Sequence, residues 1–314
     1  MEATMPESAA ETVVITGALS YTGKYATRLL LDRGYKIRTL TFHPDRANPF
    51  GDKVQVFPYT FDDPGQLTQN LGGASTLINT YWVRFPQGTS TFEAAVQNTR
   101  ILIGAAKDAG VGRIVHVSIA NPSLGSPLGY YQGKAQLEQA VLQSGLSYTI
   151  LRPTVIFGLE DILINNIAWF IRRFPVFGIP GDGKYQIRPI YVGDMAQLII
   201  EAVAQQGNFL LDAVGPEMFT FEELVRLIAE QVGRSVRLLH LPPRLAYVFT
   251  SVIGRFVGDI ILTWEEYQGL RANLLAPEGP SSGETSLRQW LMSNRRRLGI
   301  QYASEIARHF TKGT

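Results

Sequence analysis

The stretch TVVITGALSYTGKYATRLLLDR, residues 12–33, decides the fold of this chain. Its first five residues, 12–16, are apolar or β-branched and predict a buried strand. Gly17 and Gly23 bound a short turn, and residues 24–33 show the apolar spacing of a helix. A strand, a glycine turn and a helix in this order predict a loop that holds a dinucleotide pyrophosphate on its backbone N–H groups and on the helix N-terminus.

Ser20 occupies the middle of this turn, where such loops usually carry a glycine. A serine is small and its hydroxyl can donate to a phosphate oxygen, but a positive φ at this position would strain it. A nucleoside-triphosphate P-loop fits less well, because five residues separate Gly17 from Gly23 instead of four and Tyr25 stands where Ser or Thr would bind magnesium. The remaining alternative is a turn with a structural role only.

Predicted strands and helices alternate through the first half of the chain. This alternation predicts an α/β fold with a doubly wound parallel sheet, the Rossmann architecture. Ligands of such sheets bind at the carboxyl ends of the strands. The strands are expected at residues 12–16, 36–42, 54–58, 76–79, 113–118 and 147–152, and the helices at 23–33, 66–70, 91–109 and 130–144.

The second half of the chain is predicted to be mainly helical. We expect a dinucleotide-binding domain over residues 1–158 and a smaller, mainly helical C-terminal lobe over residues 159–314, interleaved through return strands near 187–192 and 208–212. A glycine- and proline-rich loop is expected at 174–183. Helices are predicted at 161–173, 193–204, 220–232 and 245–261, and in three segments after Thr263 that are separated by a turn-rich stretch at 276–283.

Residues 245–262 are the most apolar later segment, and their apolar side chains recur at the spacing of one helical face. Arg255 and Asp259 interrupt the segment, which is too short to cross a bilayer, so no membrane span is predicted. Burial of this face in the core is the first prediction. A membrane-surface or partner-docking face is the alternative.

The composition narrows the classes of function. A formal net charge of +2 is too small to indicate a nucleic-acid partner. The chain has no cysteine, which excludes disulfides, thiolate catalysis and cysteine-ligated metals and fits a reducing, cytoplasmic compartment. Its four histidines fall in no metal-ligand spacing, so no metal is predicted. Residues 1–11 lack the basic start and apolar stretch of a signal peptide.

Tyr130 and Lys134 stand four residues apart at the start of a predicted helix, on one face and within mutual reach. A lysine ammonium beside a phenol lowers the pKa of the phenol. Such a tyrosine can pass a proton to a carbonyl oxygen while a hydride arrives, and the lysine can also hold a ribose hydroxyl. Tyr130 and Lys134, together with Ser118 at the end of the fifth predicted strand, are therefore the candidate catalytic residues.

Over residues 12–240 the chain resembles the short-chain dehydrogenase/reductase superfamily in its extended or atypical branch, which includes NmrA-like and epimerase/dehydratase-like members. The resemblance implies a nicotinamide dinucleotide as cofactor and a small-molecule substrate. The motifs that carry it are residues 16–23, Ser118, residues 130–134, RPTVIFG at 152–158 and IYVGD at 190–194.

The resemblance also implies a role for individual residues around the cofactor. Lys134 would hold the nicotinamide ribose, and Tyr130 would act as acid or base. The remaining implied contacts are Gly17, Ser20, Tyr21, Thr22 and Gly23 at the pyrophosphate, Thr60 and Phe61 at the adenine, Thr80 and Tyr81 at the ribose, and Pro153 and Val155 at the nicotinamide.

The choice between NAD and NADP depends on the end of the second strand, where the sequence reads TFHPDR at 41–46. A carboxylate there would bind the adenosine ribose of NAD, and none is present. His43 and Arg46 are placed to contact the 2′-phosphate of NADP, which favours NADP slightly. A solvated Arg46 in a turn is the alternative.

One departure from the family bears on catalysis. The family sets a Ser or Thr just after the fifth strand to polarise the substrate carbonyl, and here Ile119 or Ala120 fills that place. Ser118 lies slightly early, and a structural hydroxyl at a strand end explains it equally well. The resemblance includes members with similar gaps that hold the dinucleotide without turning it over, such as NmrA-like redox sensors and the accessory subunit of respiratory complex I.

Three functions follow from these observations. The first is an NAD(P)H-dependent oxidoreductase acting on a small, apolar organic substrate, and the second is a non-catalytic NAD(P)H-binding sensor or assembly subunit. A sugar-nucleotide epimerase or dehydratase is third; Arg172, Arg173, Lys184 and Arg188 could grip a diphosphate, but the apolar residues around them suit a different substrate. A homo-oligomer or a protein partner would use the C-terminal helices.

Overall fold

The central sheet of the computed structural model has seven parallel strands in the order β11-β6-β5-β4-β1-β2-β3. The structure describes residues 10–309. The predicted doubly wound parallel sheet is confirmed, and the strands of the first half lie where the sequence places them. Their bounds are β1 Thr12–Thr16, β2 Lys36–Thr41, β3 Val54–Pro58, β4 Thr76–Asn79, β5 Arg113–Val117, β6 Ser147–Pro153 and β11 Phe209–Ala213.

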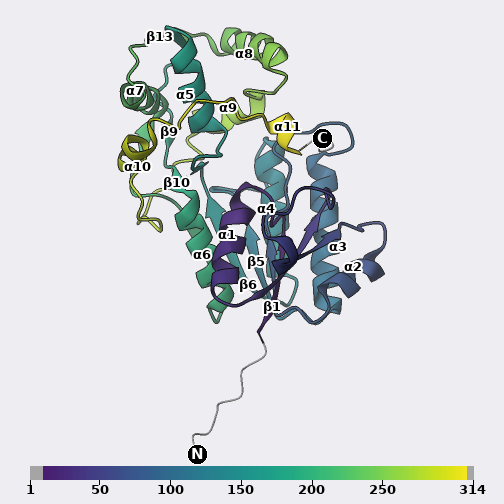
Figure 1. Ribbon diagram of the computed structural model, residues 1–314. Coiled ribbons are helices and arrows are strands. Elements are labelled where there is room, and N and C mark those ends of the chain that lie inside the picture. Colours follow the sequence, from purple (N-terminus) through teal and green to yellow (C-terminus); the bar gives the residue numbers. More distant parts are fainter. Residues whose placement is uncertain (1–9, 310–314) are drawn as a thin grey trace, which may run out of the picture.

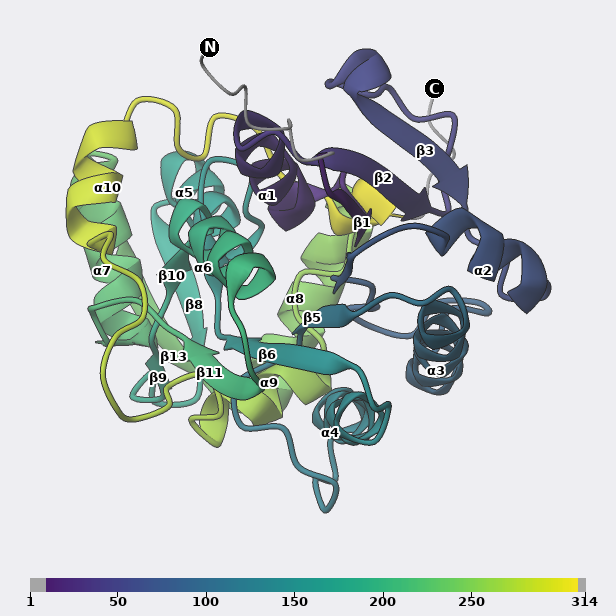
Figure 2. The ribbon, with the colours of Figure 1, turned by 90° about the horizontal axis from the view of Figure 1, so that it is seen from below.

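Helices cover both faces of the sheet (Figure 2). Helices α1 (Tyr21–Asp32) and α6 (Val192–Ala204) lie together on one face. The other face carries α2 (Pro64–Leu71), α3 (Phe92–Asp108) and α4 (Gly129–Leu142). The three central residues of β1 are apolar because both faces of the strand are buried. Val13 and Ile15 pack in the core under α1 and α6, whereas Val14 packs in the core under α2 and α3.

The order of the strands creates a crevice beside the glycine turn. From β1 the chain moves outward through β2 and β3, and then returns to place β4 on the other side of β1. The loops that leave β1 and β4 therefore diverge at the carboxyl edge, which is where doubly wound sheets bind their ligands. Gly17 follows β1 directly at this point.

The second lobe lies beyond the carboxyl edge of the sheet (Figure 1). Its core contains large buried side chains such as Phe157, Phe219 and Trp290. The helices of this lobe are α5 Leu163–Arg173, α7 Phe221–Gln231, α8 Pro243–Val257, α9 Trp264–Arg271, α10 Leu287–Asn294 and α11 Glu305–His309. Its strands form three short pairs: β7 Ile156–Phe157 with β10 Ile190–Tyr191, β9 Gln186–Ile187 with β12 Phe219–Thr220, and β8 Val176–Pro180 with β13 Arg237–Leu241.

Two features of this lobe differ from the sequence prediction. The expected loop at 174–183 contains strand β8, because residues 176–180 find a parallel partner in the distant β13 and only the following glycines form a turn. In the region of the expected return strands, β11 joins the central sheet beside β6, but residues 187–192 supply β9 and β10, which pair outside it.

The apolar helix near 245–261 is the largest departure. Helix α8 forms, but it buries only Ala246 and Gly254 among its residues, so the prediction that its apolar face packs in the core is wrong. No helix among residues 10–309 is long and apolar enough to cross a membrane. The segment 1–9, which bears on the signal-peptide prediction, lies outside the described residues.

Candidate functional site

The glycine turn has the backbone geometry that a pyrophosphate site requires. Gly17 has a φ of 73°, and its N–H donates to the carbonyl of Leu40 at 3.1 Å. A Cβ on Gly23 would lie 2.0 Å from the carbonyl oxygen of Gly17. The start of α1 can approach the turn this closely only because residue 23 is a glycine.

Ser20 takes the middle position of the turn, usually a glycine, without backbone strain. Its φ is −86°, in the ordinary extended region, so the strain expected from a positive φ is absent. The serine hydroxyl donates to the carbonyl of Gly17 at 2.6 Å and makes no cap bond to α1. The N–H groups of Tyr21, Thr22 and Gly23 at the first turn of α1 are thus left uncapped by a side chain, and they fit an anion.

The side chain of Tyr21 points away from the turn toward the second lobe. Its hydroxyl lies 2.5 Å from the position that a Cβ on Gly158 would take. This buried hydroxyl has no hydrogen-bond partner among the described residues, and burial raises the pKa of Tyr21. Tyr21 can therefore contribute its backbone N–H to a pyrophosphate, but its hydroxyl does not face that position.

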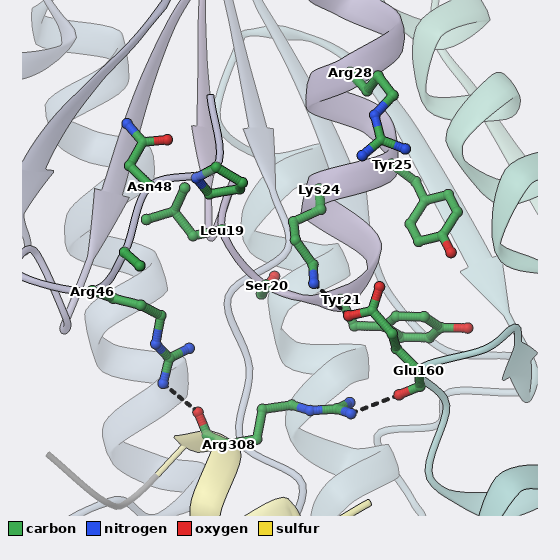
Figure 3. A pocket seen from close by; sticks show the side chains of 12 residues that line it. Leu19, Ser20, Tyr21, Lys24, Tyr25, Arg28, Arg46, Asn48, Glu160 and Arg308 are labelled. Carbon is green, nitrogen blue, oxygen red and sulfur yellow. Dashed lines mark hydrogen bonds and ion pairs between the residues drawn. The ribbon is translucent and has the colours of Figure 1, made fainter. Parts of the chain in front are cut away.

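A cavity of about 500 Å³ lies beside the turn, between α1, the loop after β2 and the C-terminal segment (Figure 3). Four cations and one carboxylate line it, so it carries an excess of positive charge. Arg46 donates to the carbonyl of Arg308 at 2.5 Å, and Arg308 donates to the carbonyl of Glu160 at 2.6 Å. Lys24 pairs with the Glu160 carboxylate, and Arg28 completes the cations. His43 is not among the lining residues.

Aromatic side chains fill the carboxyl edge on the other side of the turn. Phe61 and Tyr81, implied by the family resemblance, contact each other and two rings that the sequence analysis missed, Phe42 and Tyr59. Ring centroids in this cluster are 4.6–5.9 Å apart. Thr60, between two of them, has a buried hydroxyl without a partner in the described chain. Flat apolar surfaces beside an unused hydroxyl suit an adenine ring.

Hydrogen bonds join the ends of β1 and β4 at the crevice. The hydroxyl of Thr16 donates to Asn79 at 3.2 Å and accepts from the N–H groups of Thr80 at 2.7 Å and Tyr81 at 3.1 Å. The hydroxyl of Thr80 donates to the carbonyl of Thr16 at 2.5 Å. The Thr80 hydroxyl is therefore used in fixing the two strand ends and is not directed at a ribose.

Lys134 is buried, and its ammonium group is directed at the protein interior. Its Nζ donates to the carbonyl of Val117 at 2.9 Å and lies 4.8 Å from the centroid of the Trp82 ring. Burial lowers the pKa of Lys134 to about 7. Gly133 allows the indole this close, because a Cβ there would lie 2.7 Å from Trp82 Cη2. Trp82 carries no motif of its own and could not be singled out from the sequence.

Tyr130 packs in an aromatic enclosure. Its ring stands edge-on to Trp82 and Phe92, with centroids 5.6 and 5.8 Å apart. Burial raises the pKa of Tyr130, and the carboxylate of Glu266 raises it further. The ammonium group of Lys134 is turned to the Val117 carbonyl and the Trp82 ring, and its effect on the pKa of Tyr130 stays a prediction.

Strand β5 ends at Val117, so Ser118 is the first residue after it, and the two positions that follow carry no hydroxyl. Ile119 and Ala120 are both buried there, and Ala120 donates its N–H to the carbonyl of Pro153 at 2.9 Å. The hydroxyl of Ser118 is buried and has no hydrogen-bond partner among residues 10–309. Val155, beyond Pro153, is half-buried, and its carbonyl accepts from Ile190.

Helix α9 of the second lobe reaches this region with two adjacent carboxylates. Glu265 accepts from the N–H groups of Gly129 at 3.1 Å and Tyr130 at 3.4 Å, which caps the N-terminus of α4. Glu266 accepts from Arg84 at 2.5 Å. Neither contact is visible in the sequence, because each joins segments more than a hundred residues apart.

The glycine turn and the sheet agree with a known family. Residues 17–161 match the family model described as NAD(P)H-binding. Residues 17–161 therefore resemble an NAD(P)H-binding domain, and they lie on the Rossmann fold that the strand order shows. The match spans the crevice, the aromatic cluster and the Tyr130–Lys134 pair.

Proteins similar to this chain differ in role. It is 27% identical over 239 residues to NADH dehydrogenase 1 alpha subcomplex subunit 9 of Arabidopsis thaliana, covering 73% of this chain but only 60% of the subunit. It is 28% identical over 245 residues to a ceramide reductase of Caulobacter vibrioides, covering 76% of each. A nucleoside-diphosphate-sugar epimerase of Staphylococcus aureus has the same fold, with a TM-score of 0.75 at 15% identity over 90% of this chain and 99% of that one.

Proposed function

We propose that this protein holds NAD(P)H at the carboxyl edge of its sheet as a bound ligand and does not use Tyr130 to reduce a substrate. One observation carries this proposal: the ammonium group of Lys134 is bonded to the Val117 carbonyl beneath the Trp82 ring. In that position the lysine does not act on the Tyr130 phenol. The buried Ile119 and Ala120, in place of a polarising hydroxyl, support the same conclusion.

The residues that would hold the cofactor fall into four groups. Gly17, Gly23 and the first N–H groups of α1 would bind the pyrophosphate. The aromatic cluster around Phe61 would take the adenine, and Pro153 and Val155 would border the nicotinamide. Arg46 would favour NADP, because its cavity is rich in cations and β2 ends without a carboxylate. In this proposal residues 1–158 bind the dinucleotide and residues 159–314 form the second lobe.

The second candidate function is reduction of a small, apolar organic substrate. Its support is the retained Tyr130 and Lys134 on one face of α4 and the similarity to a ceramide reductase. Bound NAD(P)H supplies a hydride, and a reductase of this kind needs a proton donor beside it. A tyrosine whose pKa burial has raised can donate a proton only if the enclosure of Trp82 and Phe92 opens.

A sugar-nucleotide substrate is the weakest candidate. Arg172 donates to the carbonyls of Leu298 and Arg295, and Arg188 is buried and donates to the carbonyl of Gly215. These two arginines hold the second lobe together and are not free to grip a diphosphate.

The test is to measure NADPH binding and NADPH oxidation on the same preparation, with aldehydes, ketones and quinones as substrates. We expect saturable binding, no oxidation above the rate in buffer, and the same affinity in Tyr130→Phe. The matched control is Tyr148→Phe, on β6 away from the enclosure. Oxidation that Tyr130→Phe abolishes and Tyr148→Phe preserves would establish the reductase in place of the binding protein.

A further inference from the structure

Helix α8 presents an apolar surface to solvent at the outer end of the second lobe (Figure 1). Phe256 is 87% exposed, and Phe249 is 50% exposed. Single exposed apolar residues are common on proteins, but a contiguous group on one element marks a binding surface. The exposed apolar ridge of α8 consists of Leu245, Val248, Phe249, Val252, Ile253 and Phe256.

The helix is fixed with this ridge outward. The six residues recur at intervals of three and four, which places them on one side of an α-helix. The buried residues of α8 are Gly254, on the side opposite the ridge, and Ala246, at the edge of the ridge beside Ile253. A Cβ on Gly254 would lie 2.5 Å from the carbonyl oxygen of Asp259, so the chain packs closely there. Small residues thus seat the helix, and its large residues point away from the protein.

Positive charge borders the ridge. Arg244 and Arg255 are exposed on α8, and residues 243–257 contain no aspartate or glutamate. The neighbouring β13 adds the exposed Arg237. An apolar helical face bordered by arginines is typical of helices that lie in the headgroup region of a membrane.

Other occupants fit this surface less well. A projecting ridge needs an apolar groove on a protein partner. In the described part of this chain, the cavity of Figure 3 is lined by cations, and a second cavity is lined by Arg172, Arg295 and Arg296. Neither of these two cavities offers an apolar groove to the ridge, and self-association through the ridge itself is an outcome that the test below separates from docking on lipid.

We propose that α8 docks this protein on the surface of an anionic lipid bilayer, with the apolar ridge among the acyl chains and Arg244 and Arg255 at lipid phosphates. Phe249 and Phe256 are the two aromatic residues of the ridge and would enter the bilayer boundary. This docking does not depend on the dinucleotide, because α8 shares no residue with the glycine turn or the aromatic cluster.

Vesicle flotation of the full chain tests the proposal. We expect the protein to float with vesicles of phosphatidylcholine and phosphatidylglycerol, and to float less with phosphatidylcholine alone. The double variant Phe249→Ser/Phe256→Ser is expected to remain in the dense fraction. Met292→Ser on α10, which replaces a side chain that is 56% exposed, is the matched control and is expected to float like the unaltered protein.

A charge variant tests the arginines. Arg244→Gln/Arg255→Gln is expected to lower flotation with the anionic vesicles severalfold and to leave flotation with phosphatidylcholine unchanged. Both double variants alter exposed residues, so their thermal unfolding and NADPH affinity are expected to match the unaltered protein. This readout separates loss of docking from loss of folding.

Three results would overturn the proposal. The first is failure of the unaltered protein to float with either vesicle. The second is flotation of Phe249→Ser/Phe256→Ser equal to that of Met292→Ser. The third is self-association in solution that depends on Phe249 and Phe256 and persists without lipid, because the occupant would then be a second copy.

Discussion

Gly23 lies where the turn after β1 and the first turn of α1 approach each other most closely. The sequence predicted this position because the requirement is local: a strand, a turn and a helix within 22 residues leave little room for other arrangements. The same locality explains how Ser20 could replace a glycine. Its extended φ follows from its place immediately before α1, where that conformation is normal.

A methyl group at residue 23 is expected to disrupt the turn. Gly23→Ala should lower the free energy of unfolding by about 1–3 kcal/mol, because its Cβ would overlap the Gly17 carbonyl, and should abolish NADPH binding. Urea denaturation and fluorescence titration measure the two effects. Gly104→Ala in the interior of α3 is the control, since a Cβ there meets no atom within 4 Å; it should leave NADPH binding unchanged and raise the free energy of unfolding by about 0.5–1 kcal/mol. Normal NADPH binding by Gly23→Ala would remove the pyrophosphate assignment.

The contacts of the Lys134 ammonium group could not be predicted from the sequence. Spacing placed it on one face with Tyr130, but the contacts that fix its ammonium group come from Val117 on β5 and from Trp82 after β4. Those contacts depend on the tertiary fold. They direct the ammonium group to the Val117 carbonyl and the Trp82 ring.

The buried lysine predicts a pH dependence of stability. Burial lowers the pKa of Lys134 in the folded protein to about 7, below the unfolded value of about 10.4. Between these values the unfolded chain binds more protons at this site, so its contribution to the free energy of unfolding rises with pH. Above about pH 7, this site should raise the free energy of unfolding of the unaltered protein by at most about 1.4 kcal/mol per pH unit. Lys134→Met should lack this rise, and urea denaturation at a series of pH values measures it. The exposed Lys107→Met is the control, and parallel curves for the unaltered protein and Lys134→Met would refute the assignment.

Helix α9 connects the second lobe to the crevice through its first turn. Its capping residue Thr263 was not singled out in the sequence, although Thr263 and Glu266 have the spacing of a capping box. The partners of Glu265 and Glu266, Gly129 and Arg84, could not be predicted, because they belong to other elements.

Two substitutions compare the side-chain cap of α9 by Thr263 with the ion pair between Glu266 and Arg84. Thr263→Ala removes the side-chain cap of α9 and should cost about 1 kcal/mol of unfolding free energy. Glu266→Ala also removes the partner of a guanidinium that is only about a quarter exposed, and should cost about 1.5–3 kcal/mol more. Equal losses in urea denaturation would mean that the ion pair contributes nothing.

Helix α8 and strand β8 mark the limit of pattern-based prediction for whole elements. The period of residues 245–261 predicted a helix with one apolar face, and the helix is present. The spacing of apolar residues identifies one face of a helix but not what that face contacts. Here small residues elsewhere on the helix pack against the protein. Strand β8 was missed because its partner β13 is distant in sequence and glycine and proline surround it.

The fold of the whole molecule brings the glycine turn, the aromatic cluster and the start of α4 with Tyr130 to the carboxyl edge of the sheet. Strand order made this predictable, since parallel strands carry their loops to one edge. The second lobe was predictable only as a helical region. Its contacts with that edge, through Glu160, Glu265, Glu266 and Arg308, depend on tertiary packing.

Titration of the purified chain with NADPH, followed by calorimetry, is the most direct test of the central claim. We predict one saturable site per chain, a melting temperature that rises with NADPH concentration, and no consumption of the cofactor. Gly23→Ala should lack both binding and the rise in melting temperature. Absence of heat and of thermal protection in the unaltered protein would contradict the account.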